Sequence, residues 1–201
     1  MEKLENMKRL FDIILSIILI LVFVPLIIVI SIIIYISSGR PVIFTQKRIG
    51  RYGKDFNILK FRTMVNNAQF TGTGLDSYED DPRVTNFGRI LRASSLDELP
   101  QLLNILTGKM SFVGPRPPIS NSPFVYDDYP DRIKERFLVR PGVTGLAQIN
   151  GRNELSWEEK WEFDIEYIRK KNLILDCHII VVTIIKVLKN EGSFDLKRNQ
   201  K

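Results

Sequence analysis

The stretch IILSIILILVFVPLIIVISIIIYI, from Ile13 to Ile36, contains no charged side chain. A continuous apolar helix of about 20 residues is long enough to cross the hydrocarbon core of a bilayer. This stretch is longer than the apolar core of a signal peptide, and no small-residue cleavage site follows it. The segment therefore predicts a helix inserted in a membrane, and we assign residues 1–40 to a membrane anchor.

The flanks of this segment favour a particular topology. Proline removes one helical hydrogen bond, so we expect the anchor helix to be kinked at Pro25. Basic residues, which tend to remain in the cytoplasm, lie on both sides of the segment: Lys3, Lys8 and Arg9 before it, and Arg40, Lys47, Arg48 and Arg51 after it. A re-entrant helix with both ends in the cytoplasm satisfies this pattern. If the helix spans instead, its more basic C-terminal side is the cytoplasmic one, so either topology places the rest of the chain on the cytoplasmic face.

The remainder of the 201-residue chain reads as one small cytoplasmic domain over residues 41–190, followed by a tail over 191–201. Turn residues and apolar periodicity predict short strands at 41–44 and 56–61, a turn at 50–54, a loop at 66–82, and helices at 87–92, 98–107, 131–137, 157–170 and 173–188. The predicted class is α+β, mainly helical. The last helix is apolar nearly all round, so it either lies in the membrane interface or is buried in the core.

Composition limits the kinds of partner, disulfide and metal site that this chain can have. The formal charge of +6 suits an anionic partner such as lipid headgroups, nucleotide phosphates or nucleic acid. The single cysteine, Cys177, excludes an internal disulfide and fits a reducing compartment. With one cysteine and one histidine, a zinc site of nitrogen and sulfur ligands is not expected, whereas carboxylates suit a hard cation.

The segment Ser94-Ser95-Leu96-Asp97-Glu98-Leu99-Pro100 contains adjacent acidic residues at a predicted helix start. Ser95 and Glu98 match a capping box, but that register places Pro100 beyond the first turn. If Asp97 caps the helix instead, Pro100 falls within the first turn, where proline is tolerated. An ionised Asp97 is then a candidate nucleophile toward phosphorus, and Glu98 a candidate partner in metal binding.

Phosphoryl transfer also needs basic groups that neutralise oxygen charge. Lys60 and Arg62 alternate along a strand, which predicts that they share a face. Arg92 lies about one helical turn before the acidic pair. Arg116 and Arg140 each stand in a rigid turn rich in proline and glycine.

Five motifs occur in an order that resembles the bacterial sugar transferase family, the monotopic polyprenyl-phosphate sugar-1-phosphate transferases. They are Lys60-Phe61-Arg62-Thr63-Met64, Asp81-Pro82-Arg83, Ser95-Leu96-Asp97-Glu98-Leu99-Pro100-Gln101-Leu102, Gly114-Pro115-Arg116-Pro117, and Arg140-Pro141-Gly142-Val143-Thr144-Gly145-Leu146-Ala147-Gln148-Ile149-Asn150-Gly151-Arg152. The resemblance extends from about residue 8 to residue 189. The family's re-entrant helix breaks at a Ser-Pro pair, where this chain has Val24-Pro25.

The resemblance implies an enzyme that uses a UDP-sugar and Mg²⁺. Asp97 attacks the sugar-bearing phosphorus and UMP leaves; polyprenyl phosphate then attacks the covalent phosphosugar-enzyme, giving a polyprenyl diphosphate sugar. Asp97 and Glu98 are the expected catalytic and metal-binding residues. The expected substrate-binding residues are Lys60, Arg62, Arg92, Arg116, Arg140, Gln148, Arg152 and Asp176. The expected location is the bacterial inner membrane, in contact with membrane lipid; a homodimer is compatible with the sequence, and no nucleic acid is expected.

Three other functions fit parts of the sequence. A membrane-anchored glycosyltransferase would release UDP instead of UMP. A non-enzymatic assembly protein of an envelope-polysaccharide machine would tolerate the loss of Asp97. A basic, membrane-tethered nucleic-acid binder agrees with the charge, but no recognised nucleic-acid-binding motif is present.

Overall fold

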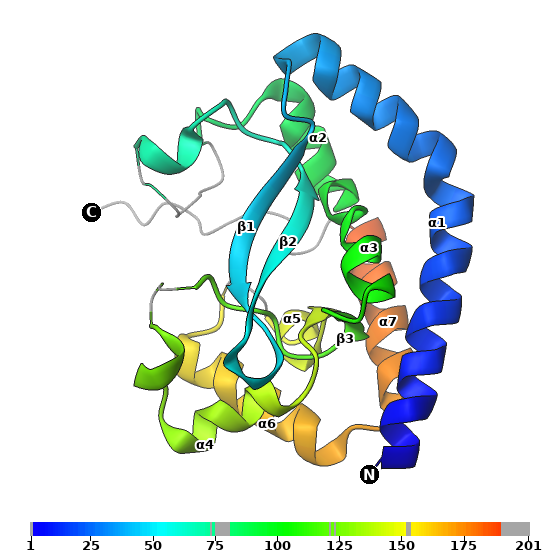
Figure 1. The fold of residues 1–201 in the computed structure, drawn as a ribbon, viewed down its shortest axis with the longest axis vertical. Coiled ribbons are helices and arrows are strands. Elements are labelled where there is room, and N and C mark those ends of the chain that lie inside the picture. Colours follow the sequence, from blue (N-terminus) through cyan, green and yellow to red (C-terminus); the bar gives the residue numbers. More distant parts are fainter. Residues whose placement is uncertain are drawn as a thin grey trace.

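The computed structural model describes residues 2–72, 74, 81–120, 122, 124–151 and 154–189. The predicted tail, 191–201, lies outside the described residues. The fold is α+β, as predicted. A long N-terminal helix, α1 (Glu2–Ser38), runs along one side of a small domain that contains mostly helices, a few short strands and a final helix, α7 (Leu173–Leu188) (Figure 1).

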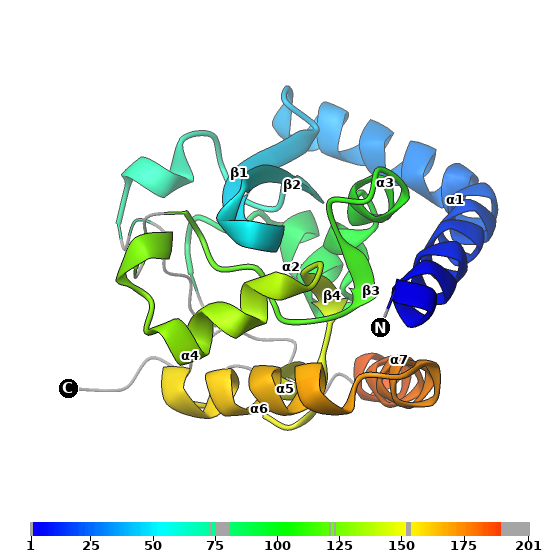
Figure 2. The ribbon, with the colours of Figure 1, turned by 60° about the horizontal axis from the view of Figure 1, so that its bottom comes forward.

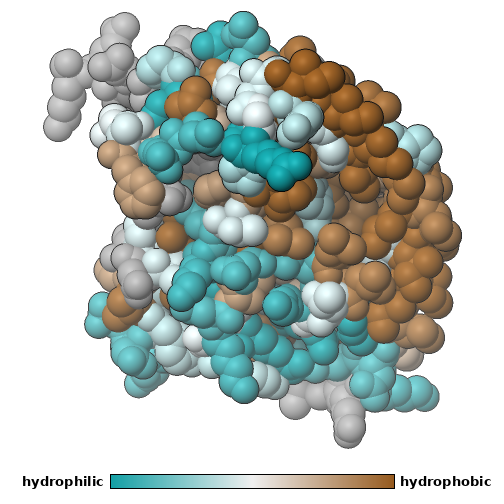
Figure 3. Space-filling model, turned by 45° about the horizontal axis from the view of Figure 1, so that its top comes forward, coloured by the Kyte–Doolittle hydropathy of each residue, from teal (hydrophilic) through white to brown (hydrophobic). Residues whose placement is uncertain are grey.

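Helix α1 continues through Pro25 without separating into two helices, and its axis bends part-way along (Figure 1). By length and composition it is the one helix in the described part of the chain that is able to cross a membrane. Large apolar side chains cover its outer surface, among them Leu21, Val22 and Ile36, which are 69%, 63% and 78% exposed. They form the broad apolar band in Figure 3. An exposed apolar band of this kind marks a membrane or a partner.

The N-terminal part of α1 is fixed to the domain by polar contacts. Lys8 forms a 2.6 Å ion pair with Asp176 of α7. The Arg9 guanidinium donates hydrogen bonds to the last carbonyls of helix α3 (Gln101–Leu106), at 2.6 Å to Ile105 O and 2.8 Å to Leu106 O. A cation at a helix C-terminus satisfies carbonyls that have no partner within the helix.

The C-terminal part of α1 packs on the same domain. Ile30 and Ile34 are each only 2% exposed and form a core cluster with Phe61 and Leu91. Beyond the helix, the Arg62 guanidinium donates a hydrogen bond to Gly39 O at 2.8 Å. Both ends of α1 therefore contact the domain.

Strands β1 (Ile43–Ile49) and β2 (Asp55–Phe61) form an antiparallel hairpin in which Phe44 pairs with Lys60 and Arg48 with Phe56. The predicted turn at 50–54 is confirmed, since Gly50 N donates to Lys54 O at 2.9 Å. The prediction ended the first strand too early, at residue 44, because the charged residues Lys47 and Arg48 had been interpreted as a flank of the anchor.

The chain around the acidic pair differs from both predicted registers. Helix α2 (Asn86–Ala93) ends before Ser95, which has a left-handed backbone with a φ of 56° and makes no capping hydrogen bond. Asp97 and Glu98 lie in a single 3₁₀ turn, Leu96–Glu98, and α3 begins only at Gln101. The predicted capping roles of Ser95 and Asp97 are therefore wrong. Pro100 directly precedes α3, where its missing N–H is not needed.

The second half of the domain contains strands β3 (Ser111–Val113) and β4 (Gly142–Thr144), which are parallel and were not predicted, and helices α4 (Asp131–Lys134), α5 (Leu146–Ile149), α6 (Trp157–Lys170) and α7. The predicted bounds of α6 and α7 are confirmed. Figure 2 shows α7 beside the first part of α1. Asp176 and Ile179 of α7 are buried, while Ile174 and Leu188 are 84% and 79% exposed. Of the two alternatives for this helix, complete burial in the core is therefore excluded by these exposed side chains.

Two ion pairs join the α4 region to α6 in different environments. Arg136, in the turn after α4, pairs with Asp164 at 2.7 Å, and the two side chains are 4% and 3% exposed. Arg132 of α4 pairs with Glu162, and these side chains are 55% and 57% exposed. Breaking the buried pair should destabilise the fold far more than breaking the exposed pair, because removal of one buried partner leaves the other charge buried and without compensation.

We therefore predict that Arg136→Met lowers the free energy of unfolding by about 3–5 kcal/mol. The matched variant Arg132→Met should change it by less than about 1 kcal/mol. Denaturant unfolding of the detergent-solubilised chain measures both values. Equal effects of the two substitutions would contradict the assignment of Arg136–Asp164 as the structural pair.

Candidate active site

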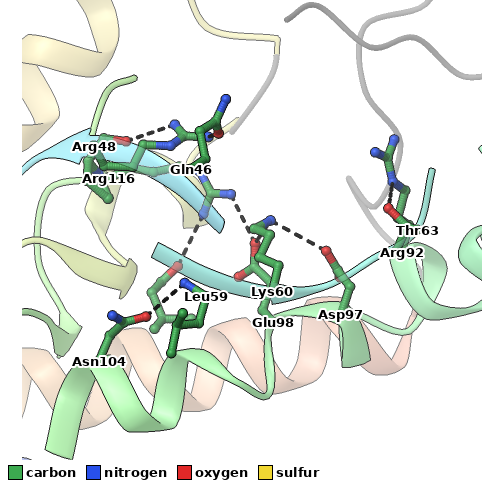
Figure 4. A network of polar contacts seen from close by, with 12 residues as sticks. Gln46, Arg48, Leu59, Lys60, Thr63, Arg92, Asp97, Glu98, Asn104 and Arg116 are labelled. Carbon is green, nitrogen blue, oxygen red and sulfur yellow. Dashed lines mark hydrogen bonds and ion pairs between the residues drawn. The ribbon is translucent and has the colours of Figure 1, made fainter. Parts of the chain in front are cut away.

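The two adjacent carboxylates meet one lysine. Lys60, at the end of β2, places its Nζ 2.7 Å from Glu98 Oε1 and 3.4 Å from Asp97 Oδ2. The Asp97 and Glu98 side chains are 10% and 12% exposed. Figure 4 shows Lys60 between the two carboxylates. The hairpin and the 3₁₀ turn thus assemble a compact group of one cation and two anions.

Arg116 extends this group on the side of Glu98. Its Nη2 donates to Glu98 Oε1 at 3.0 Å, so that oxygen accepts from both Lys60 and Arg116. On the side of Asp97 lies Arg92 of α2, whose Nε donates to Thr63 Oγ1 at 2.9 Å (Figure 4). Three of the predicted basic residues, Lys60, Arg92 and Arg116, therefore surround the acidic pair.

The electrostatic balance at Asp97 combines opposing effects. Burial raises the pKa of this carboxyl above its ordinary value, and the neighbouring charge of Glu98 acts in the same direction. Lys60 and Arg92 lower the pKa again. A desolvated carboxylate that is kept available by cations is a better nucleophile than a fully hydrated one.

The turn that holds Arg116 is fixed at four successive carbonyls. Gly142 N donates to Pro115 O at 2.9 Å, and Ile49 N donates to Pro118 O at 3.0 Å. The two carbonyls between them accept hydrogen bonds from arginine side chains. Arg136 Nη2 donates to Arg116 O at 2.9 Å, and Arg48 Nη1 donates to Pro117 O at 3.0 Å. The buried Arg136–Asp164 pair and strand β1 therefore both set the position of Arg116.

Arg48 is a part of the site that the sequence prediction missed. Its guanidinium contacts Gln46 and Pro117 O, and burial lowers its pKa, with Arg116 acting in the same direction and Glu98 opposing (Figure 4). Gln46 and Arg48 alternate along β1, so a strand predicted to its full length would have placed them on one face. The predicted strand ended at residue 44 and left both residues out.

The Asp81-Pro82-Arg83 motif has a structural role. Arg83 makes a 2.6 Å ion pair with Asp81, and its Nη1 donates to the carbonyls of Ala68, Thr71 and Gly74 at 2.9, 2.7 and 2.8 Å. These contacts join Arg83 to the described residues of the predicted loop at Ala68, Thr71 and Gly74.

Three predicted substrate-binding residues lie outside the cluster. Arg62 binds Gly39 O and Asn66 near the end of α1. Arg140 donates from Nε to Gly108 O, just beyond α3. Asp176 is 2% exposed and joins helices, since it pairs with Lys8 of α1 and accepts a 2.8 Å hydrogen bond from Tyr167 of α6. Arg152 lies outside the described residues.

Gln148 lines a cavity that adjoins the acidic pair. The cavity has a volume of about 190 Å³. Its walls are Ser95, Glu98, Leu99, Leu102, Ile105, Phe112, Arg116, Val143, Thr144, Gln148, Thr183 and Val187. Its lining therefore combines the charged Glu98 and Arg116 and a few uncharged polar side chains with a mainly apolar wall.

The described residues contain no group of three or more acidic, histidine or cysteine side chains that could hold a metal ion by themselves. Asp97 and Glu98 provide two adjacent carboxylates, and Mg²⁺ commonly binds through one or two carboxylates together with substrate phosphates. The residues thus fit an ion that is shared with a diphosphate, and not a closed protein cage.

The site combines the nearly buried carboxylates of Asp97 and Glu98 with three basic groups. Such a group suits attack on a phosphorus atom, because the cations offset charge on the phosphate oxygens.

Comparison with known proteins agrees with this geometry. The sequence profile of the family described as "Bacterial sugar transferase" matches residues 3–190. The uncharacterized sugar transferase EpsL of Bacillus subtilis is 42% identical, over 92% of this chain and 89% of EpsL. The exopolysaccharide production protein ExoY of Rhizobium meliloti is 39% identical, over 93% of this chain and 88% of ExoY.

A longer relative has a more specific name. The UDP-glucose:undecaprenyl-phosphate glucose-1-phosphate transferase of Escherichia coli is 40% identical, over 94% of this chain but only 41% of that protein. The matching region in each relative includes nearly the whole of this chain. The chain therefore belongs to the bacterial sugar transferase family.

Proposed function

We propose that this protein transfers a sugar-1-phosphate from a UDP-sugar to polyprenyl phosphate, undecaprenyl phosphate in bacteria, and releases UMP. The observation that carries the proposal is the buried Asp97 carboxylate beside Glu98, with Lys60 at 3.4 Å and 2.7 Å from the two side chains. The names of the relatives support it, since one acts on UDP-glucose and undecaprenyl phosphate. The product would begin the membrane steps of envelope polysaccharide, capsule or glycoprotein glycan synthesis.

The first step forms a covalent intermediate. A carboxylate oxygen of Asp97 attacks the phosphorus that bears the sugar. The bond from this phosphorus to the bridging oxygen of the diphosphate breaks, and the oxygen leaves with UMP. Lys60 and Arg92 flank Asp97 and are placed to offset charge on the phosphate oxygens during this displacement.

The second step regenerates the enzyme. A phosphate oxygen of the polyprenyl phosphate dianion attacks the phosphorus of the aspartyl phosphosugar. The bond to Asp97 breaks, so the carboxylate is restored and a polyprenyl diphosphate sugar forms. Arg116, which is held 3.0 Å from Glu98, is placed to bind the incoming phosphate.

Asp97 and Glu98 would hold Mg²⁺ together with the diphosphate of the donor. When bound, the ion supplies positive charge that reduces repulsion between the Asp97 carboxylate and the anionic substrate.

The contacts of α1 support a re-entrant anchor and a cytoplasmic catalytic domain. The domain binds Lys8 and Arg9 near the first end of α1 and Gly39 just beyond its last end. Figures 1 and 2 show α1 running along the domain between these contacts. A helix with both ends on one domain has both ends on the same side of the membrane. Basic flanks place that side in the cytoplasm. The acceptor lipid cannot leave the membrane, so it reaches a nucleophile fixed at headgroup height by diffusion within the membrane plane alone.

The strongest alternative is a membrane-anchored glycosyltransferase that releases UDP. The position of Asp97 favours phosphoryl transfer, because Lys60 contacts its carboxylate and the charge of Arg92 acts on it as well. Identification of the released nucleotide separates the two reactions.

We predict that Asp97→Asn abolishes turnover, because an amide does not attack phosphorus and regenerate. Burial raises the pKa of Asp97, so the ionised carboxylate is less favourable in the folded chain than in the unfolded chain and lowers the stability of the fold above that pKa. The variant should therefore melt at or above the wild-type temperature. Release of UMP near the wild-type rate would remove Asp97 from the mechanism.

We predict that a chelator stops turnover and that Mg²⁺ restores it. Because Lys60 and Arg116 already contact the carboxylates, Mg²⁺ alone should leave the melting temperature unchanged, while Mg²⁺ with the UDP-sugar should raise it. Thermal unfolding with each ligand alone and with both measures this. A rise with Mg²⁺ alone would show a complete protein site.

For topology, we predict that cysteines introduced at Glu2 and Arg40, in a Cys177→Ser background, both resist a membrane-impermeant thiol reagent in intact cells. Both should react once the cells are opened. Labelling of the Glu2 position in intact cells would show a spanning helix.

A further inference from the structure

The cavity beside Glu98 differs in character from the rest of the site. It lies between α3, α7, β4 and α5, and Glu98 and Arg116 are the charged residues of its lining. The apolar residues of the lining are Leu99, Leu102, Ile105, Phe112, Val143 and Val187, and the uncharged polar ones are Ser95, Thr144, Gln148 and Thr183. An apolar cavity of about 150 Å³ is large enough to bind benzene. A space of about 190 Å³ therefore has room for a five-carbon isoprene unit.

The polar side chain of Gln148 in this wall has no partner. Both its Oε1 and its Nε2 are buried, and neither makes a hydrogen bond in the described structure. Thr144 and Thr183, which also line the cavity, bind each other at 2.6 Å and leave the amide unsatisfied. A buried amide without partners costs stability, which indicates a role toward a ligand.

The helices that form the cavity also carry exposed apolar side chains on their outer surfaces. Leu103 of α3 is 49% exposed, and Ile184, Ile185 and Leu188 of α7 are 53%, 46% and 79% exposed. The apolar interior of the cavity thus lies behind helices whose outer surfaces are apolar too. A lipid chain is able to pass between them without contacting water.

We propose that this cavity receives the isoprene unit next to the phosphate of the lipid acceptor, with the Gln148 amide binding a phosphate oxygen beside Arg116. The inference rests on the proposed function and divides the site into two. The donor approaches Asp97 from the side of Lys60 and Arg92, and the acceptor approaches from the side of Glu98 and Arg116 (Figure 4).

The chemistry of the two substrates supports this division. A nucleotide-sugar carries hydroxyl groups along its length, and burying them against leucine, phenylalanine and valine would leave them without hydrogen bonds. An isoprenoid phosphate has one charged end and an apolar remainder. These match the basic Arg116 and the apolar residues of the cavity lining. The cavity is therefore complementary to the acceptor and not to the donor.

The test separates the two half-reactions in the full-length chain in nanodiscs. Without acceptor, one equivalent of UMP per enzyme reports the formation of the covalent intermediate. With undecaprenyl phosphate, steady-state turnover gives the KM for the acceptor. Val187→Phe fills the cavity, and Leu188→Phe, on the neighbouring exposed position of α7, is the matched control.

We expect Val187→Phe to raise the acceptor KM at least tenfold and to leave the acceptor-free UMP release unchanged. Leu188→Phe should change neither value. Gln148→Leu, which keeps the volume but removes the amide, should raise the acceptor KM with normal UMP release and a normal KM for the UDP-sugar.

An unchanged acceptor KM in both Val187→Phe and Gln148→Leu would overturn the proposal. Equal loss of acceptor-free UMP release in these variants would also overturn it, because the cavity would then serve the donor or the fold. If the wild-type chain itself releases no UMP without acceptor, the covalent mechanism of the proposed function fails instead.

Discussion

The contact of one lysine with two adjacent carboxylates sets the main constraint on this structure. Lys60 lies 2.7 Å from Glu98 and 3.4 Å from Asp97, in a site where both acids are nearly buried. Two anions so close together and so poorly hydrated need a cation between them. The hairpin provides that cation from its last residues, so the pairing of β1 with β2 and the 3₁₀ turn at Leu96–Glu98 have to form together.

A second group of cations acts on the backbone instead of the substrate. Arg136 and Arg48 bind the carbonyls of Arg116 and Pro117, and Asp164 compensates the charge of Arg136. Burying guanidinium groups for this purpose is costly unless their hydrogen bonds are satisfied. The arrangement fixes the direction of Arg116, which a flexible side chain on a mobile loop would not do. In a chain this short, residues far from the reacting atoms thus determine the geometry at Glu98.

The sequence predicted those features that depend on local pattern. The bounds of α6 and α7 and the α+β class followed from apolar periodicity, and Lys60, Arg92 and Arg116 do gather around Asp97 and Glu98. It did not predict β3 and β4, since three-residue parallel strands are defined by a distant partner and have little periodicity of their own. Arg140 was predicted in the site from its rigid basic turn, and Asp176 from the family resemblance. In the structure Arg140 binds Gly108 O beyond α3, and Asp176 binds Lys8 of α1. A single sequence does not distinguish a charged residue that makes such a structural contact from one that binds a substrate.

The anchor and the chemistry depend on each other. Asp176, a buried residue of α7, binds Lys8, and Arg9 binds the end of α3, so α1 is joined both to α7 and to the helix that follows the acidic pair. In the proposed reaction the membrane confines the acceptor to a plane. The contacts of Lys8 and Arg9 then hold the domain, and with it Glu98 and Arg116, in a fixed position relative to the anchor helix. Both constraints would reduce the entropic cost of bringing the reactants together before the acceptor binds.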